Sequence, residues 1–228
     1  MYNESIHTNN LSVGYGKRVV RSGINLSIMA GEMVCLLGRN GSGKSTLLRT
    51  LAGLQPALGG EMTIGDVAIV LTERLSVDNT TVRDIVSLGR YPYLGPLGVL
   101  RDEDHRIVKD AMHKVGISEA EEKAFFNAMS DGEKQRVLIA KAIAQTTPII
   151  LLDEPTAHLD LPNRIAVLQL LQALARDEQK TIIISTHELD LAMRFADRIL
   201  LFADDEIIID TPDKMRQTGA IKKAFGIE

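Results

Sequence analysis

Three stretches of contrasting character follow one another in MVCLLGRNGSGKSTLLRTLAGL, residues 33–54. Residues 33–37 are typical of a strand buried on both faces of a parallel sheet, because no polar residue alternates with the apolar ones. After the glycines, residues 44–54 predict a helix whose apolar face is formed by Leu47, Leu48, Leu51 and Leu54. A buried strand that leads through glycines directly into a helix indicates an α/β protein.

Other short apolar segments predict further strands. They are residues 24–28, 67–71, 149–152 and 181–186. From about residue 78 to 145 the strand patterns stop, and three helical patterns occupy residues 81–89, 102–116 and 131–145. Three helices in succession favour a separate lobe over crossover helices of one sheet. We therefore expect a single domain spanning 1–228, with a core at about 1–77 and 146–228 and a helical lobe at about 78–145.

Composition excludes several classes of protein. The 26 Lys and Arg residues against 30 Asp and Glu residues give a net charge of −4, which argues against a protein held on nucleic acid by phosphate contacts. No apolar stretch approaches the roughly 20 residues of a membrane-crossing helix. The N-terminus has no basic region followed by an apolar one, so no signal peptide is expected. The single cysteine, Cys35, lies in an apolar strand and is expected to be buried and inert.

The glycine-rich stretch has the spacing of a phosphate-binding loop, with Gly38, four residues and then Gly43, Lys44 and Ser45. Glycines let consecutive N–H groups surround a phosphate, and the helix N-terminus adds positive potential. Lys44 is expected to reach the β and γ phosphates, and the Ser45 hydroxyl to bind Mg²⁺. The residues predicted to contact the nucleotide are Gly38, Arg39, Asn40, Gly41, Ser42, Gly43, Lys44, Ser45 and Thr46.

Acidic residues and a histidine follow two of the predicted buried strands. Asp153 and Glu154 end one strand, and His187 follows another. Parallel strands direct their C-terminal ends to one crevice, which brings these side chains to the edge that carries Ser45. In a phosphate-loop protein, Asp153 is expected to hold Mg²⁺ and Glu154 to polarise the attacking water.

Five motifs in order, GRNGSGKS, MSDGEKQR, IILLDEP, TAHLD and STH, resemble the ATP-binding subunit of ATP-binding cassette (ABC) transporters. The resemblance covers nearly the whole chain. It implies a P-loop NTPase with a RecA-like parallel sheet, an N-terminal antiparallel β layer and a helical sub-lobe. It also implies ATP and Mg²⁺ as cofactors, ATP hydrolysis coupled to transport, and a homodimer.

The resemblance also assigns roles to individual residues. MSDGEKQR is similar to the family signature, whose residues Ser130 and Gly132 contact the γ-phosphate held by a second copy of the protein. The same residues are also a capping box at a helix start, in which Ser130 pairs with Glu133. His187 resembles the switch histidine and acts in catalysis with Glu154 and Lys44. Asp160 resembles the loop aspartate at the dimer interface, and Tyr15 resembles the aromatic residue that stacks on adenine.

A narrower resemblance lies in TVRDIVSLGRYPYLGPLG, residues 81–98. It is similar to the importer subfamily for ferric siderophores, haem and cobalamin. This implies transmembrane permease subunits as partners, indirect action with a substrate-binding protein, and a peripheral place on the cytoplasmic face of the membrane. The alternative is a soluble ABC scaffold, as in iron–sulfur cluster assembly, against which this segment argues. Nucleic acid is not an expected partner.

Three positions depart from the family pattern. Thr72 or Glu73 occupies the place of the usual glutamine, and the sequence favours neither. The segment 59–68 is short where the family has a longer strand-turn-strand connection. Asp131 replaces a glycine of the signature, where a carboxylate suits the helix dipole but lies near an incoming γ-phosphate.

Overall fold

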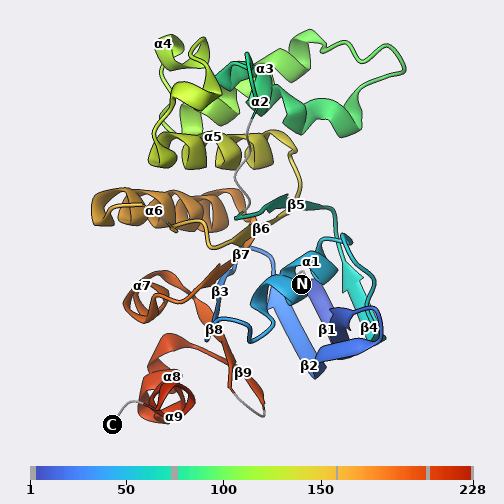
Figure 1. Cartoon of the computed structure of the whole chain (residues 1–228), viewed down its shortest axis with the longest axis vertical. Coiled ribbons are helices and arrows are strands. Elements are labelled where there is room, and N and C mark those ends of the chain that lie inside the picture. The colour runs from blue at the N-terminus through green and yellow to red at the C-terminus, as the bar shows by residue number, and fades with distance from the viewer. Residues whose placement is uncertain (1–3, 73–76, 158, 204–205, 227–228) are drawn as a thin grey trace. The chain divides into compact units, whose positions relative to one another are not determined.

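The computed structural model describes the chain in two compact units. The described residues are 4–72, 77–157, 159–203 and 206–226. The first unit comprises residues 1–71, 148–155 and 171–228, and the second comprises 72–147 and 156–170. Figure 1 draws the elements of both. The second unit contains the three predicted helical segments. It also contains residues 156–170, which we expected in the core. That the two units form one domain remains a prediction.

A six-stranded sheet forms the centre of the first unit, in the order β5-β6-β7-β3-β8-β9. Its strands are β3 (Met33–Gly38), β5 (Val67–Val70), β6 (Ile149–Asp153), β7 (Thr181–Thr186), β8 (Arg198–Phe202) and β9 (Ile207–Asp210). All neighbours are parallel except β8 and β9. Every residue of β3, β6 and β7 is buried, which confirms the predicted strands, whereas no predicted segment covers β8 or β9.

An antiparallel sheet of three strands forms the predicted N-terminal β layer. It contains β1 (Glu4–Tyr15), β2 (Arg18–Met29) and β4 (Gly59–Ile64), in the order β2-β1-β4. Only Gly65 and Asp66 separate β4 from β5 of the six-stranded sheet. The short segment noted in the sequence is therefore a direct passage from one sheet to the other.

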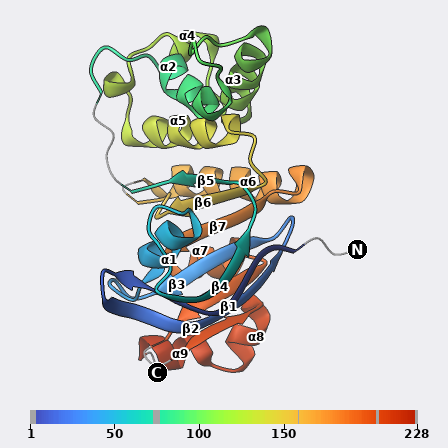
Figure 2. The same cartoon turned by 90° about the vertical axis from the view of Figure 1, so that its right-hand side faces the viewer.

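Helix α1 (Lys44–Leu51) contacts β1, β3 and β6, and Figures 1 and 2 show it between the two sheets. The helix stops before Leu54 because Gly53 adopts a left-handed φ of 70°. The Leu54 N–H bonds to the Arg49 carbonyl at 2.9 Å and the Gly53 N–H to the Thr50 carbonyl at 3.0 Å, a glycine-based C-terminal cap. Leu54 is 56% exposed, so its predicted place on the buried face is wrong.

The remaining helices of the first unit follow β7. They are α7 (Leu189–Phe195), α8 (Pro212–Gln217) and α9 (Ala220–Phe225). Helix α7 packs on β3, and α8 and α9 pack on β8. Helix α6 (Leu161–Glu178) begins in the second unit and ends in the first. Within the described residues, no helix is long and apolar enough to cross a bilayer.

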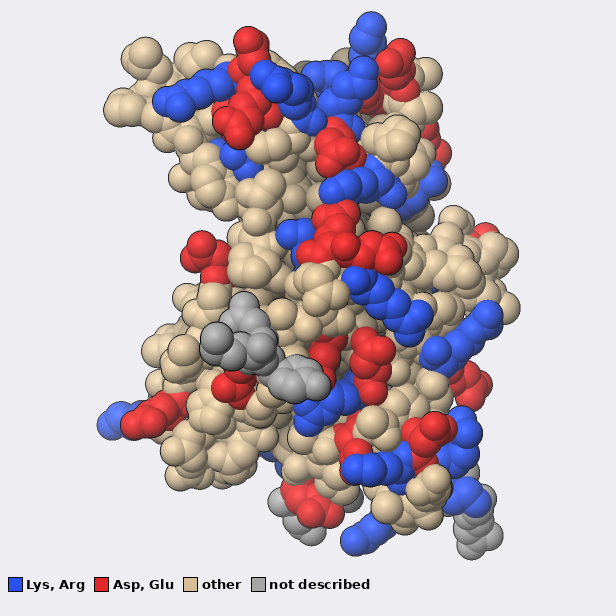
Figure 3. Space-filling model, turned by 180° about the vertical axis from the view of Figure 1, so that it is seen from behind, with Lys and Arg blue, Asp and Glu red and all other residues tan. Residues whose placement is uncertain are grey.

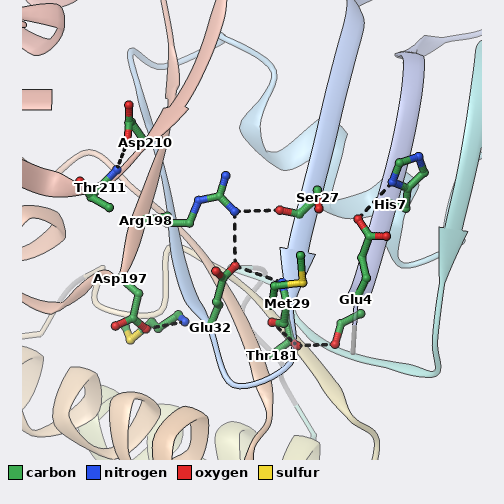
Figure 4. Close-up of polar contacts among 12 residues, drawn as sticks. Glu4, His7, Ser27, Met29, Glu32, Thr181, Asp197, Arg198, Asp210 and Thr211 are labelled. Carbon is green, nitrogen blue, oxygen red and sulfur yellow. Dashed lines mark hydrogen bonds and ion pairs between the residues drawn. The ribbon is translucent and has the colours of Figure 1, made fainter. Parts of the chain in front are cut away.

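Polar contacts join the start of β8 to the end of β2 (Figure 4). The Arg198 guanidinium donates to the Ser27 carbonyl at 2.8 Å and lies 3.5 Å from the Glu32 carboxylate. The same Glu32 carboxylate accepts the Met29 N–H at 3.1 Å. These bonds satisfy backbone groups at the edge of the antiparallel sheet and fix the turn that leads into β3.

The second unit is built from short helices around a core of its own. They are α2 (Val82–Ser87), η1 (Leu88–Tyr93), α3 (Asp102–Lys114), α4 (Glu119–Glu122), η2 (Phe126–Ala128) and α5 (Asp131–Ala144). The core residues include Val82, Ile85, Val108, Met112, Phe126 and Val137. The predicted helical segments are thus confirmed.

A buried ion pair crosses this helical unit. The Arg90 Nε lies 2.8 Å from Asp104 Oδ1, and each side chain is 8% exposed. Arg90 also donates to the Ala144 carbonyl at 2.9 Å and lies 4.1 Å from the centre of the Tyr93 ring. The Arg101 backbone N–H and the Arg90 side chain hold the pKa of Asp104 below its usual range. A buried charge destabilises a protein unless it is paired. Arg90 of η1 keeps its partners only while α3 and α5 stay in place, so it fixes how the three helices meet.

Charged side chains of both signs are interspersed on the face drawn in Figure 3. Exposed ion pairs include Lys109 with Glu119 and Lys214 with Asp210, each at 3.4 Å. Charges of mixed sign largely cancel at a distance, so the described residues of this face produce no extended field of one sign.

We predict that Gly89→Ala destabilises the helical unit. A Cβ at Gly89 would lie 2.4 Å from the Lys141 carbonyl oxygen and 2.9 Å from the Ala144 Cβ, so η1 and α5 would have to separate. The expected loss is about 1–3 kcal/mol of unfolding free energy, measured by urea denaturation. The matched control is Gly95→Ala, whose Cβ would meet nothing within 4 Å. Equal unfolding midpoints for both variants would contradict the close packing.

Candidate nucleotide site

A cavity of about 480 Å³ opens beside the glycine-rich loop of the first unit. Its lining residues are Tyr15, Arg18, Val20, Asn40, Gly41, Gly43, Lys44, Ser45, Thr46 and Glu154. All but Arg18 and Val20 were predicted from the sequence to contact nucleotide or take part in its hydrolysis. The cavity lies within the size range of small-molecule sites in proteins.

The loop depends on its glycines for shape. Gly41 and Gly43 have left-handed φ values of 78° and 105°, which side-chain-bearing residues rarely adopt. At Gly38, a Cβ would lie 2.8 Å from the Cβ of Phe202, so the loop leaves β3 in contact with β8. Gly43 is the N-cap of α1 and supplies no side-chain cap, so the first N–H groups of the helix can face a ligand.

Two other loop residues have distinct surroundings. The Arg39 guanidinium donates to the Phe225 carbonyl at the end of α9, at 3.2 Å. The Ser42 Oγ is buried, and it has no hydrogen-bond partner within the described residues. A buried hydroxyl with no partner inside the protein is a group that a bound phosphate could satisfy.

Lys44 is only 5% exposed and folds back over the loop. Its Nζ donates to the Gly38 carbonyl at 2.8 Å and to the Arg39 carbonyl at 3.1 Å. Burial lowers the pKa of Lys44, and the nearby carboxylates of Glu154 and Asp153 oppose this shift. The ammonium group is thus held at the phosphate loop with a third N–H still able to donate.

The Asp153 carboxylate joins the C-terminal ends of β6 and β7 to the first turn of α1, the helix that follows β3. Its Oδ1 accepts from the Ser45 hydroxyl at 2.9 Å and from the Ser185 hydroxyl at 2.6 Å. Asp153 ends β6, Ser185 is its register partner in β7, and Ser45 follows β3. A hydroxyl and a carboxylate side by side are the hard oxygen donors that Mg²⁺ prefers.

Glu154 has a left-handed φ of 48°, which turns its side chain away from the strand direction. The Ser185 Oγ accepts the Glu154 N–H at 2.9 Å and so holds this backbone conformation. The Glu154 Oε1 lies 3.7 Å from Nδ1 of His187, which is 57% exposed in its side chain. The structure therefore brings Lys44, Asp153, Glu154 and His187 to one edge of the sheet.

Tyr15 stands at the rim of the cavity and is 54% exposed. Its hydroxyl and that of Thr46 lie 3.2 Å apart, with either one as donor. The Gln55 side chain bonds to the Gly14 carbonyl at 3.2 Å and to the Thr50 hydroxyl at 3.0 Å, which ties the end of β1 to α1. The ring is thus held beside the start of the helix with a face available for stacking.

The predicted signature residues lie in the second unit. Ser130 is the N-cap of α5 and forms the predicted capping box, in which its N–H and hydroxyl both donate to Glu133 at 2.7 Å. These bonds hold the pKa of Glu133 below its usual range. A Cβ at Gly132 would lie 3.4 Å from the Asn163 amide of α6. The starts of α5 and α6 therefore lie side by side, with room for an ordinary contact at Gly132.

Asp160 caps the start of α6. Its carboxylate accepts the Asn163 N–H at 3.1 Å, and its carbonyl accepts the Arg164 N–H at 3.0 Å. Asp160 thus caps α6 as Ser130 caps α5.

Two residues that depart from the family pattern, Asp131 and Thr72, are both exposed. Asp131 is the first residue of α5, while Glu73 lies outside the described residues. Cys35 is buried as expected, and burial raises the pKa of its thiol.

Three residues that lie against the proposed site residues were not predicted from the sequence. Ser185 sits inside an apolar strand, where a lone serine resembles a buried core residue. Arg21 contacts the loop through its side chain, and Asn163 contacts Gly132 from another helix. The register of β6 with β7 could have indicated Ser185, because it places that residue opposite Asp153.

The fold and this cavity define a phosphate-loop nucleotide-binding protein with a helical second unit. The sequence model of the ABC transporter family matches residues 22–157, more than half of the chain. The chain belongs to this family and is one of its ATP-binding subunits, an ABC ATPase.

Three relatives align over most of their length. The chain is 41% identical to an ABC transporter ATP-binding protein of Methanocaldococcus jannaschii, over 89% of this chain and 74% of the relative. It is 36% identical to the iron(3+)-hydroxamate import ATP-binding protein FhuC of Bacillus subtilis, over 93% and 87%. It is 35% identical to the petrobactin import ATP-binding protein FpuD of Bacillus anthracis, over 99% and 88%.

Solved structures agree with the fold. A chain of an inward-facing ABC transporter of metal-chelate type superposes with a TM-score of 0.91 and 28% identity, over 98% of this chain and 90% of that one. A dimeric bacterial ABC transporter cassette superposes with a TM-score of 0.78 and 27% identity, over 91% and 98%. These comparisons bear out the predicted ABC ATPase fold.

We predict that Ser185→Ala reduces ATP turnover by roughly 100-fold, because displacing a reacting group by about an ångström has effects of that size. The variant removes the hydroxyl that holds Asp153 and the Glu154 N–H. It also leaves the partly buried Glu154 N–H without this partner, which costs up to about 1–3 kcal/mol of stability. Phosphate release and thermal unfolding measure the two effects.

The control is Thr181→Val, at the opposite end of β7. Thr181 is as buried as Ser185, and its hydroxyl bonds to Ser5 at 2.8 Å. We expect lower stability with normal turnover in this variant. Normal turnover in Ser185→Ala would contradict the role given to Ser185.

Proposed function

We propose that the chain is the ATP-hydrolysing subunit of an ABC importer that takes up a metal chelate of the ferric siderophore, haem or cobalamin kind. The observation that carries the hydrolytic role is the junction of Ser45, Asp153 and Ser185 under the phosphate loop, with Glu154 and His187 beside it. The import role draws support from two relatives, the iron(3+)-hydroxamate importer ATPase FhuC and the petrobactin importer ATPase FpuD, and from the transporter structure of metal-chelate type.

The loop and Lys44 bind the triphosphate. Gly41 and Gly43 line the cavity, and the hydroxyl of Ser42 lacks a partner among the described residues. The Lys44 ammonium lies over the same loop and neutralises charge that develops on the phosphates. Tyr15 at the rim stacks on the adenine, since an aromatic ring can stack on the π face of a base.

Ser45 and Asp153 are the residues that would hold Mg²⁺. Their oxygens are hard donors, and they already lie 2.9 Å apart. Among the described residues, no cluster of three or more His, Cys, Asp or Glu could hold a metal ion. This fits an ion that takes most of its ligands from phosphates and water. When bound, Mg²⁺ supplies Lewis-acid stabilisation of the phosphate oxygens.

Glu154 and His187 act on the water and the γ-phosphate side. The left-handed backbone at Glu154, held by Ser185, sets the carboxylate at the cavity wall. From there Glu154 orients or deprotonates the attacking water, while His187 contacts the γ-phosphate side. Most of the rate enhancement comes from positioning and electrostatics, as in other phosphoryl transfers.

Two copies of the chain close on two ATP molecules. In this arrangement Ser130 and Gly132 of one copy contact the γ-phosphate held by the loop of the other, and Asp160 lies at the interface. A dimeric cassette among the similar structures supports this proposal. In the second unit, Ser130 and Asp160 are already ordered by their helix-capping hydrogen bonds.

The dimer acts on two permease subunits at the cytoplasmic face of the membrane, and through them on a substrate-binding protein. The exposed surface of residues 88–99 is the proposed contact with the permease. Tyr91 is 64% exposed, Tyr93 46% and Leu97 89%. Exposed aromatic side chains of this kind are enriched at protein interfaces. A partner that is only soluble would favour the scaffold function instead.

We predict that Glu154→Gln still binds ATP and dimerises but loses turnover by about 100-fold or more, because the amide cannot act as a base. Phosphate release measures turnover, and gel filtration with ATP measures the dimer. Lys44→Ala serves as the contrasting variant, with weakened ATP binding. Retained hydrolysis in Glu154→Gln would count against the proposed mechanism.

We predict that Asp131→Gly gives equal or tighter ATP-driven dimerisation. Asp131 is the first residue of α5, where its negative charge stabilises the helix by ~0.3–1 kcal/mol through the helix dipole. The same charge repels an approaching γ-phosphate. Analytical ultracentrifugation in the Glu154→Gln background measures the dimer. A clear loss of dimer would mean that Asp131 is itself a ligand.

A further inference from the structure

Arg21 of β2 contacts the phosphate loop from outside the cavity. Its Nε donates to the Ser42 carbonyl at 2.8 Å. Its Cγ lies 3.1 Å from the place where a Cβ on Gly43 would be. Arg21 is half-buried, whereas its neighbour Arg18 is exposed and lines the cavity.

A β-bulge explains why Arg21 reaches the loop. In the antiparallel pair of β1 and β2, Val13 pairs with Arg21 but the next residue, Gly14, pairs with Val19. Val20 is therefore an extra residue, and consecutive side chains no longer alternate across the sheet. Val20 Cγ1 and Arg21 Cγ both lie 3.1 Å from the Cβ position of Gly43.

The bond to Ser42 controls the direction of the next N–H. A trans peptide is planar, so its carbonyl and its N–H point in opposite directions. With the Ser42 carbonyl held toward Arg21, the Gly43 N–H points away from Arg21. Gly43 has a φ of 105°, and glycine also adopts negative φ readily, so the peptide could turn over if its carbonyl were released.

We propose that Arg21 is a positioning residue for nucleotide binding, which fixes the Ser42–Gly43 peptide with its N–H directed at the bound phosphates. This inference rests on the proposed ATP function. A Gly43 N–H that is fixed in advance stabilises the bound nucleotide equally in the ground state and in the transition state. Losing that orientation therefore raises KM and the Kd for ADP more than it lowers kcat.

The test compares Arg21→Gln with Arg21→Met. The Gln Nε2 is as many bonds from the backbone as the Arg Nε that bonds to Ser42, so Gln keeps the donor without the charge. Met matches the length but has no donor. We expect Arg21→Met to weaken ADP binding and raise KM for ATP by about tenfold, with kcat within about threefold, and Arg21→Gln to stay within about threefold of the wild type. Calorimetry measures ADP binding, and phosphate release gives KM and kcat.

Two results would overturn the inference. Wild-type nucleotide affinity in Arg21→Met would show that the loop needs no such bond. Equal weakening in both variants would show that the charge acts, and not the hydrogen bond. Thermal unfolding checks the fold, and Arg21→Leu replaces Met if that variant does not fold. Failure of the wild-type chain to bind ATP would instead overturn the proposed function itself.

Discussion

The site depends on one carboxylate oxygen that accepts hydrogen bonds from two hydroxyl groups, one in the neighbouring strand β7 and one in the first turn of α1. Asp153 Oδ1 binds Ser45 after β3 and Ser185 within β7, and Ser185 in turn holds the backbone of Glu154. Since β6, β7 and β3 are adjacent and parallel, their C-terminal ends are brought together by the register of the sheet. The sheet thereby sets the geometry of the phosphate loop, the metal donors and the proposed base at once.

In the second unit, the groups that stabilise the helices are also those proposed to bind a ligand. Ser130 and Glu133 cap α5, and Asp160 caps α6. Gly132 of α5 lies beside Asn163 of α6, so the two helix starts are neighbours. These bonds order the surface before a second copy arrives, so less conformational entropy is lost on binding. Ser130 has a single O–H, which donates to Glu133 here, so the proposed phosphate contact requires that hydroxyl to turn from Glu133 to the phosphate.

Local sequence patterns predict the helices and strands well. They do not predict contacts that depend on how distant strands pair. The loop at 38–45 and the buried strands follow from spacing and from continuous apolar stretches, and the structure confirms those elements. Leu54 was misplaced because Gly53 ends the helix one turn early. Ser185 and Arg21 depend on strand register and on a bulge, neither of which is visible in a single strand.

Complementation between two inactive variants tests the central claim, that each ATP lies between the loop of one copy and the signature of the other. Lys44→Ala and Ser130→Ala, each in the Glu154→Gln background, are mixed with ATP, and the nucleotide retained by the dimer is counted after gel filtration. We expect that neither variant alone retains ATP, whereas the mixture retains about one ATP per mixed dimer, since one of its two sites is intact. A mixture that retains none, while Glu154→Gln alone retains ATP, would contradict the claim.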